Sequence, residues 1–210
     1  MNNRVASVLV VGFLLIAMPL GFFFYFHSKT PTPPPAPQTY GPAPHFLLTD
    51  QYGSTVSSDD LKGFIYVADF FFTSCKTVCP QMSELMKRVQ ESYKTEPRVR
   101  MLSFTVNPEV DSVPVLKDYA DRYGAIENKW HFLTSTNPAY LRDTVVVQGF
   151  KVPAVPDDAD PGQFTHTDRF MVIDANGNIR GLYDVMSDGQ VDSMFNHLER
   201  LLVEKGGRAR

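Results

Sequence analysis

Runs and spacings of apolar residues divide the body of the chain into strands and helices. Residues 64–72 are mostly β-branched and aromatic, which predicts a strand buried on both faces. The apolar positions that follow have helical spacing: Met82, Leu85, Met86 and Val89. Pro80 suits the first turn of this helix, where a backbone N–H would have no partner. We therefore expect a core strand that turns directly into a helix over residues 80–93.

The remaining segments alternate strands with helices. Residues 46–50 and 55–57 flank a turn and predict a β-hairpin, and residues 169–174 and 179–183 predict a second one. The other predicted elements are strands over 99–106 and 130–133 and helices over 114–123, 137–147 and 191–203. This order predicts an α/β fold, a thioredoxin-like sandwich with a central mixed sheet and an N-terminal β-hairpin.

An uncharged apolar stretch precedes this domain. Residues 5–26 span about 33 Å as a helix, enough to cross a bilayer. A cleaved signal peptide would have a shorter apolar core and small residues at a cleavage site. Arg4 lies before the stretch, which favours a cytoplasmic N-terminus. We therefore expect a single-pass protein of the bacterial inner membrane, with its C-terminal domain facing the periplasm or the cell exterior.

Four segments follow from these patterns. Residues 1–28 are a cytoplasmic stub and transmembrane anchor, and residues 29–42 are a proline-rich linker, expected to be an extended polyproline spacer. Residues 43–205 form the thioredoxin-like domain, and residues 206–210 are a tail.

Composition narrows the classes of function. The formal net charge of -3 provides no basic field, so we expect no nucleic-acid partner. The 2 cysteines are too few for a disulfide-rich scaffold or a four-cysteine zinc site.

Both cysteines, Cys75 and Cys79, fall between the core strand and the following helix. There the helix dipole and the charge of Lys76 favour a thiolate, the form that binds soft metals or attacks disulfides. A structural disulfide is one alternative, but closing so short a loop contributes only about 2 kcal/mol by the loop-closure formula. A pair of inert buried cysteines is the other.

His166 is the candidate for a third metal ligand. It precedes the strand expected over residues 169–173, which in such a sheet would lie near the strand that leads to Cys75. Two sulfurs and one imidazole suit copper in either oxidation state, although zinc accepts the same ligands. A polar loop residue is the alternative reading of His166. His131 is expected to be a core or edge residue of a strand, and His197 to lie on the polar face of the last helix.

Three further side chains have two readings each. Asp69, within the core strand, is either a buried proton relay near the thiols or, as we favour, a hydrogen-bonded residue at an edge. Met82 and Met86 could offer thioether ligands, but their helical spacing favours the core.

Three motifs in order resemble the Sco/SenC family of membrane-anchored copper chaperones. They are Thr73-Ser74-Cys75-Lys76-Thr77-Val78-Cys79-Pro80 after a Phe-rich strand, the segment 105–112 ahead of Leu116-Lys117-Asp118-Tyr119, and Thr165-His166-Thr167 before a strand. Lys76, Asn107 and Thr165 differ from the residues that are usual in the family, and none of these differences removes a candidate ligand.

The resemblance implies that Cys75, Cys79 and His166 bind Cu(I) or Cu(II). It also implies service to the binuclear copper centre of a cytochrome c oxidase. The copper-centre subunit of a terminal oxidase would be the partner, and other copper chaperones or thiol reductants are further candidates. In this reading, a Cys75–Cys79 disulfide would release the metal.

Two enzyme classes compete with this reading. An extracytoplasmic thiol-disulfide oxidoreductase would use Cys75 and Cys79 as its catalytic redox pair, but such enzymes usually have Cys-x-x-Cys and a proline before the facing strand. A peroxidase of the peroxiredoxin type would have a threonine three residues before its cysteine, whereas Thr73 lies two residues before Cys75.

Overall fold

The computed structural model describes residue 18 and residues 39–156, 164–165 and 167–206. The chain divides into two units, Met1–Pro37 and Gln38–Arg210, and the second unit carries the fold described below. The expected anchor over residues 5–26 falls almost entirely outside the described residues. Within the described part of the chain, no helix is long and apolar enough to cross a membrane.

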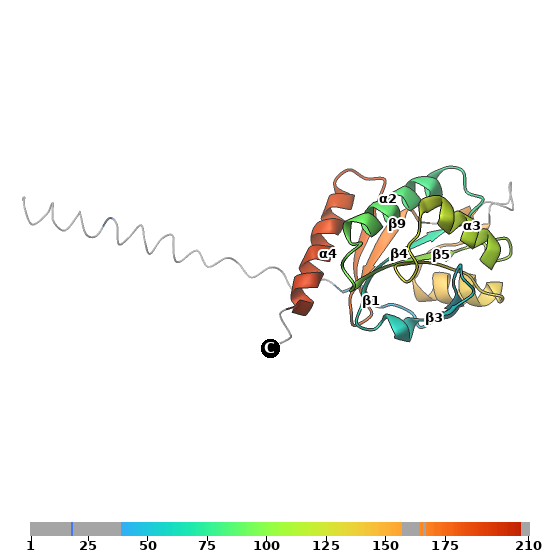
Figure 1. Ribbon diagram of the computed structural model, residues 1–210, viewed down its shortest axis with the longest axis horizontal. Helices are drawn as coiled ribbons and strands as arrows, with labels where there is room; N and C mark the ends of the chain where they lie inside the picture. The colour runs from blue at the N-terminus through green and yellow to red at the C-terminus, as the bar shows by residue number, and fades with distance from the viewer. Residues whose placement is uncertain (1–17, 19–38, 157–163, 166, 207–210) are drawn as a thin grey trace, which may run out of the picture. The chain divides into compact units, whose positions relative to one another are not determined.

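A six-stranded mixed sheet forms the centre of the second unit (Figure 1). Its strand order is β1-β10-β9-β4-β5-β6. Strands β4, β5 and β6 are parallel, whereas β9 is antiparallel to β4, β10 to β9, and β1 to β10. The bounds are β1 Gly41–Pro42, β4 Ile65–Phe71, β5 Val99–Thr105, β6 Trp130–Leu133, β9 Arg169–Ile173 and β10 Asn178–Asp184.

Helices cover both faces of this sheet. Helices α2 (Val78–Ser92), α3 (Val113–Tyr123) and α4 (Gln190–Gly206) lie on one face in Figure 1. The other face is covered by η2 (Tyr140–Gly149), a π-helix, and by the hairpin of β2 (Leu47–Thr49) and β3 (Thr55–Ser57). The short elements are the 3₁₀ turn η1 (Ser58–Leu61) and the paired strands β7 (Val155–Pro156) and β8 (Phe164–Thr165).

Aromatic residues of β4 fill the core on both sides of the sheet. Phe70 stacks on Phe104 and meets Phe150 at the end of η2, with ring centroids 5.6 and 5.2 Å apart. Phe71 points to the opposite face, where its ring lies 5.2 Å from Tyr119 of α3. All seven residues of β4 are buried, because consecutive side chains of a strand point to opposite faces and both faces are covered.

The expected α/β thioredoxin-like fold with a central mixed sheet is therefore confirmed, and both expected hairpins are present. The sheet begins slightly earlier than expected, because β1 (Gly41–Pro42) falls inside the range assigned to the linker. The helix expected over residues 137–147 is present as a π-helix, and Asn137 accepts a hydrogen bond from the backbone N–H of Tyr140.

Candidate metal centre

The two cysteines lie at the carboxyl end of β4, the central strand of the sheet. Cys75 is in the turn after the strand, and its backbone N–H donates to the Phe72 carbonyl over 3.2 Å. Cys79 is the second residue of α2, so it belongs to the helix and not to the loop where the sequence placed it. Its position in the first helical turn directs the thiol toward the sheet, and the Cys79 side chain is fully buried.

Burial changes the chemistry expected of these thiols. Cys75 is 7% exposed and Cys79 is 0% exposed. A hydrogen bond with Cys75 and the loss of solvent on burial raise the pKa of the Cys79 thiol, and the charge of Asp69 adds to the effect. The thiolate that the helix dipole and Lys76 were expected to favour is therefore disfavoured at Cys79 in the metal-free pair, first by the hydrogen bond with Cys75 and then by burial.

Asp111 fixes the start of the cysteine loop, a role that the sequence reasoning missed. Its two carboxylate oxygens accept from the Thr73 backbone N–H at 3.3 and 3.2 Å. The hydroxyls of Thr73 and Thr105 also donate to it. Burial raises the pKa of Asp111, and the bonds from Thr105 and Thr73 act in the opposite direction. Only its place in the 105–112 motif could have drawn attention to this residue.

The segment before His166 packs against the cysteine loop. The Phe164 ring of β8 lies 5.8 Å from the ring of Phe72, three residues before Cys75. Strand β9, which follows this segment, pairs directly with β4, as the sequence predicted. His166 itself lies outside the described residues, so its role as a ligand stays a prediction.

The other residues singled out in the sequence are placed as follows. Asp69 is on a central strand and 1% exposed, so the favoured edge position is wrong. Met82 and Met86 are fully buried core residues, as expected. The His131 Nδ1 atom lies 3.1 Å from the Asp50 Oδ2 atom. His197 is 8% exposed, so the expected polar position is wrong for this histidine.

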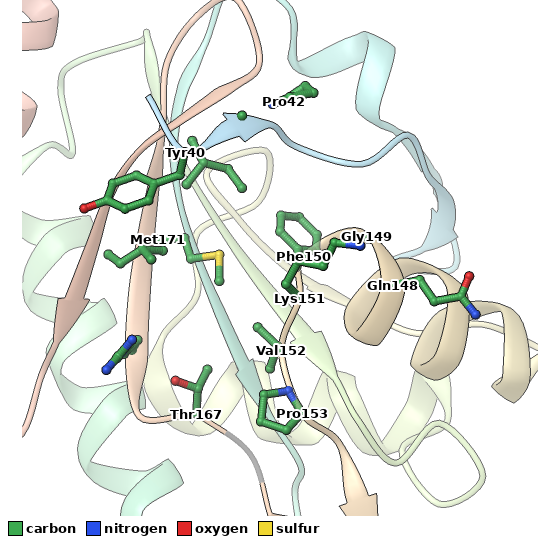
Figure 2. A pocket seen from close by; sticks show the side chains of 14 residues that line it. Tyr40, Pro42, Gln148, Gly149, Phe150, Lys151, Val152, Pro153, Thr167 and Met171 are labelled. Carbon is green, nitrogen blue, oxygen red and sulfur yellow. The ribbon is translucent and has the colours of Figure 1, made fainter. Parts of the chain in front are cut away.

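A cavity of about 590 Å³ lies between the sheet and the chain after η2. In Figure 2, Thr167 and Pro153 are at one end of it, and Tyr40 and Pro42 are at the other. Neither cysteine lines the cavity, although Thr167 directly follows His166. The cavity is therefore not part of the cysteine site.

The donor set at the end of β4 suits a soft metal ion. Two thiols in hydrogen-bonding contact, shielded from solvent, match the preference of copper for sulfur ligands. The described residues contain no cluster of three or more His, Cys, Asp or Glu side chains that could hold a metal.

A mixed α/β sheet with a buried dithiol where its central strand meets a helix defines a thioredoxin-like protein with a redox-active or metal-binding pair. The family model of SCO1/SenC matches residues 35–203. The chain belongs to the SCO1/SenC family.

Individual relatives agree with this assignment. A SCO1 protein homolog of Bacillus subtilis is 30% identical over 164 residues, which is 78% of this chain and 83% of that protein. A second relative is BsSco, described as a member of the Sco family of cytochrome c oxidase assembly proteins with a disulfide switch. Its structure aligns with a TM-score of 0.67 and 28% identity, and the alignment covers 79% of this chain and 96% of BsSco. Copper-bound ScoI of Bradyrhizobium japonicum shares the fold, with a TM-score of 0.64 and 24% identity over 76% and 98% of the two chains.

Proposed function

We propose that this protein is a membrane-anchored copper metallochaperone that assists assembly of the binuclear copper centre of a cytochrome c oxidase. Copper is held by the sulfurs of Cys75 and Cys79 and by the imidazole of His166. One observation carries the proposal: two buried, hydrogen-bonded thiols lie at the end of the central strand, beside the segment that leads to His166.

Chain geometry supports His166 as the third ligand. Phe164 contacts Phe72, and the two residues from Phe164 to His166 span at most about 7 Å. Cys75 is only three residues beyond Phe72 and turns back on it through its backbone hydrogen bond. An imidazole at position 166 is therefore within reach of the cysteine loop.

The protein's residues account for binding and release of the metal. Each thiol that coordinates copper gives up its proton, so binding exchanges protons for the metal at the two sulfurs. If a disulfide of another protein oxidises Cys75 and Cys79 to a disulfide, that disulfide takes up their two electrons and two protons, and the sulfurs lose their capacity to bind as thiolates. Copper loading and redox state are thus two alternatives for one pair of atoms.

The receiving partner in this proposal is the copper-centre subunit of the oxidase. Other copper chaperones and thiol reductants would supply copper and electrons to the domain. The description of BsSco as a cytochrome c oxidase assembly protein supports this choice of partner. The anchor over residues 5–26 and the location in a bacterial inner membrane belong to the same proposal.

Thiol-disulfide exchange is the second candidate function. It is favoured by the hydrogen bond between the two thiols, which already places their sulfurs side by side. In that role the reduced pair would pass two electrons to a disulfide of the partner, whose two sulfurs take up the protons, while Cys75 and Cys79 become a disulfide.

The test is copper binding by the reduced fragment that starts at Tyr40. We expect one tightly bound copper per protein and, for Cu(II), a thiolate charge-transfer band. Both should be lost in Cys75→Ser, and His166→Ala should weaken binding at least tenfold. His45→Ala is the matched control, because the His45 side chain is 87% exposed. Absence of bound copper, with disulfide exchange intact in wild type and His166→Ala, would contradict the chaperone role and favour the second function.

A further inference from the structure

We propose that Asp111 is a positioning residue for the dithiol: its buried carboxylate holds the cysteine loop so that the Cys75 sulfur faces that of Cys79. The inference rests on the proposed function, because it concerns how the copper-binding pair is presented. Asp111 is separated from Thr73 by 38 positions in the chain, and its side chain is fully buried.

The carboxylate ties the loop to the end of the neighbouring strand. Thr73 is the second residue after β4 and the second before Cys75, and it gives Asp111 both its backbone N–H and its hydroxyl. Thr105 ends β5, whose register places it beside Phe71 at the end of β4. Asp111 therefore links the ends of two adjacent strands at the point where the cysteine loop begins.

Asp111 is itself fixed by the turn that carries it. Its backbone N–H donates to the Asn107 carbonyl over 2.9 Å, and the Asn107 N–H donates to the Thr105 hydroxyl oxygen over 2.9 Å. Thr105 thus accepts from the turn and donates to the carboxylate that ends it. The arrangement is a closed network, so the carboxylate cannot move without breaking several bonds.

A carboxylate is the side chain that this geometry requires. It receives one backbone N–H and two hydroxyl donors, and only an acceptor with two oxygens can accept from all of them. An asparagine offers one oxygen, and its amide group would face a donor. A fully buried carboxylate costs free energy, so these hydrogen bonds are needed to keep it in place.

The two cysteines differ in how firmly the fold holds them. Cys79 is fixed within α2, whereas Cys75 is on the turn between Thr73 and Thr77, where its sulfur lies 3.7 Å from the Thr77 hydroxyl. Release of Thr73 would let this turn shift while Cys79 stays in place. The distance between the two sulfurs, and with it both metal binding and disulfide formation, therefore depends on Asp111.

The test compares Asp111→Asn and Asp111→Ala with Ser103→Ala in the reduced full-length chain in detergent. Ser103→Ala is the matched control, because it removes another buried hydrogen bond of β5, from Trp130 over 2.9 Å, that involves none of Thr73, Thr105 and Asp111. The measurements are the melting temperature, the Cu(II) absorption and paramagnetic resonance spectra, copper affinity, and the reduction potential of the Cys75/Cys79 pair.

We expect Asp111→Ala to weaken copper binding at least tenfold, to alter the Cu(II) spectra and to shift the dithiol–disulfide equilibrium about tenfold, or about 30 mV. Asp111→Asn should lie between it and wild type, and provides the folded variant if the alanine variant does not fold. Ser103→Ala should lower the melting temperature only.

Two outcomes separate this inference from the proposed function. If the Asp111 variants are less stable but keep wild-type spectra, affinity and potential, Asp111 has only a structural role and the inference is wrong. If wild type binds no copper, the proposed function fails, and the reduction potential alone then decides whether Asp111 positions the pair.

Discussion

His197 is the buried histidine of α4, and its surroundings favour the neutral imidazole. Its Nδ1 atom lies 2.6 Å from the Tyr183 hydroxyl. Burial lowers the pKa of His197 below the ordinary value of 6.5, and the positive charges of Arg200 and Arg180 add to the shift. In the unfolded chain the same ring takes up a proton near its ordinary pKa.

This difference predicts an acid-sensitive contribution to stability. Because the unfolded state binds the proton first as the pH falls below 6.5, the free energy of unfolding decreases over that range. His197→Gln should be less stable than wild type at pH 7.5, and the gap should narrow at pH 5. Urea unfolding at both pH values measures the gap. An equal gap at the two values would contradict the prediction and leave only the lost hydrogen bond.

At the level of elements, the strand-turn-helix unit of β4 and α2 determines where the thiols lie. The helix dipole at the start of α2 favours a negative charge, but packing against the sheet removes the solvent that a thiolate needs. The hydrogen bond with Cys75 and, after it, this desolvation raise the pKa of the Cys79 thiol. In the proposed function, a bound copper ion would supply the positive charge that stabilises the thiolates.

Strand β8 contacts the cysteine loop through the rings of Phe164 and Phe72. Phe164→Ala should weaken copper binding at least tenfold, because it releases the segment before His166 from Phe72. The ring pair is worth about 1 kcal/mol, so the melting temperature should fall by only about 2–4 °C.

Phe195→Ala is the control for this variant. Phe195 is also partly buried and stacks on one aromatic ring, that of Tyr93, at 6.1 Å. Similar stability of the two variants, with weaker copper binding in Phe164→Ala only, would support the role of β8. Unchanged binding in Phe164→Ala would contradict it.

On the scale of the whole molecule, segments from both ends of the second unit complete the sheet and its cover. The Tyr40 backbone N–H donates to the Ile179 carbonyl over 2.8 Å, next to the pairing of β1 with β10. Near the carboxyl end of the unit, the Leu202 carbonyl accepts a hydrogen bond from the Arg98 guanidinium over 3.2 Å. One hydrophobic core extends from Phe46 to Leu202.

We therefore expect the fragment from Gln38 onward to unfold in a single cooperative transition. Its melting temperature should match that of the full chain in detergent within about 2 °C, because the core is contained in this unit. A fragment that starts at Ala43 lacks β1 and should melt lower. Calorimetry of the three proteins measures this, and a Gln38 fragment without a transition would contradict it.

Most of the secondary structure and the position of the cysteine pair could be predicted from local sequence. Side-chain periodicity and turn residues act over a few positions, so strand β4, helix α2 and both hairpins could be read from local pattern. The adjacency of β9 and β4 followed from the order of elements. Cys75 and Cys79 could be found for the same reason, because their neighbours in space are also their neighbours in the chain.

Which polar groups are buried, and what they bind, became clear only from the packing of distant segments. The Gln51 side-chain amide donates to the Trp130 carbonyl and accepts from the Phe132 backbone N–H. Asp111 accepts from the backbone N–H of Thr73, which is 38 positions away in the chain. Such contacts join segments that no local pattern relates. The raised pKa of Cys79 was also beyond local pattern, because it depends on the contact with the Cys75 thiol and then on everything packed around Cys79, and not only on the helix that carries it.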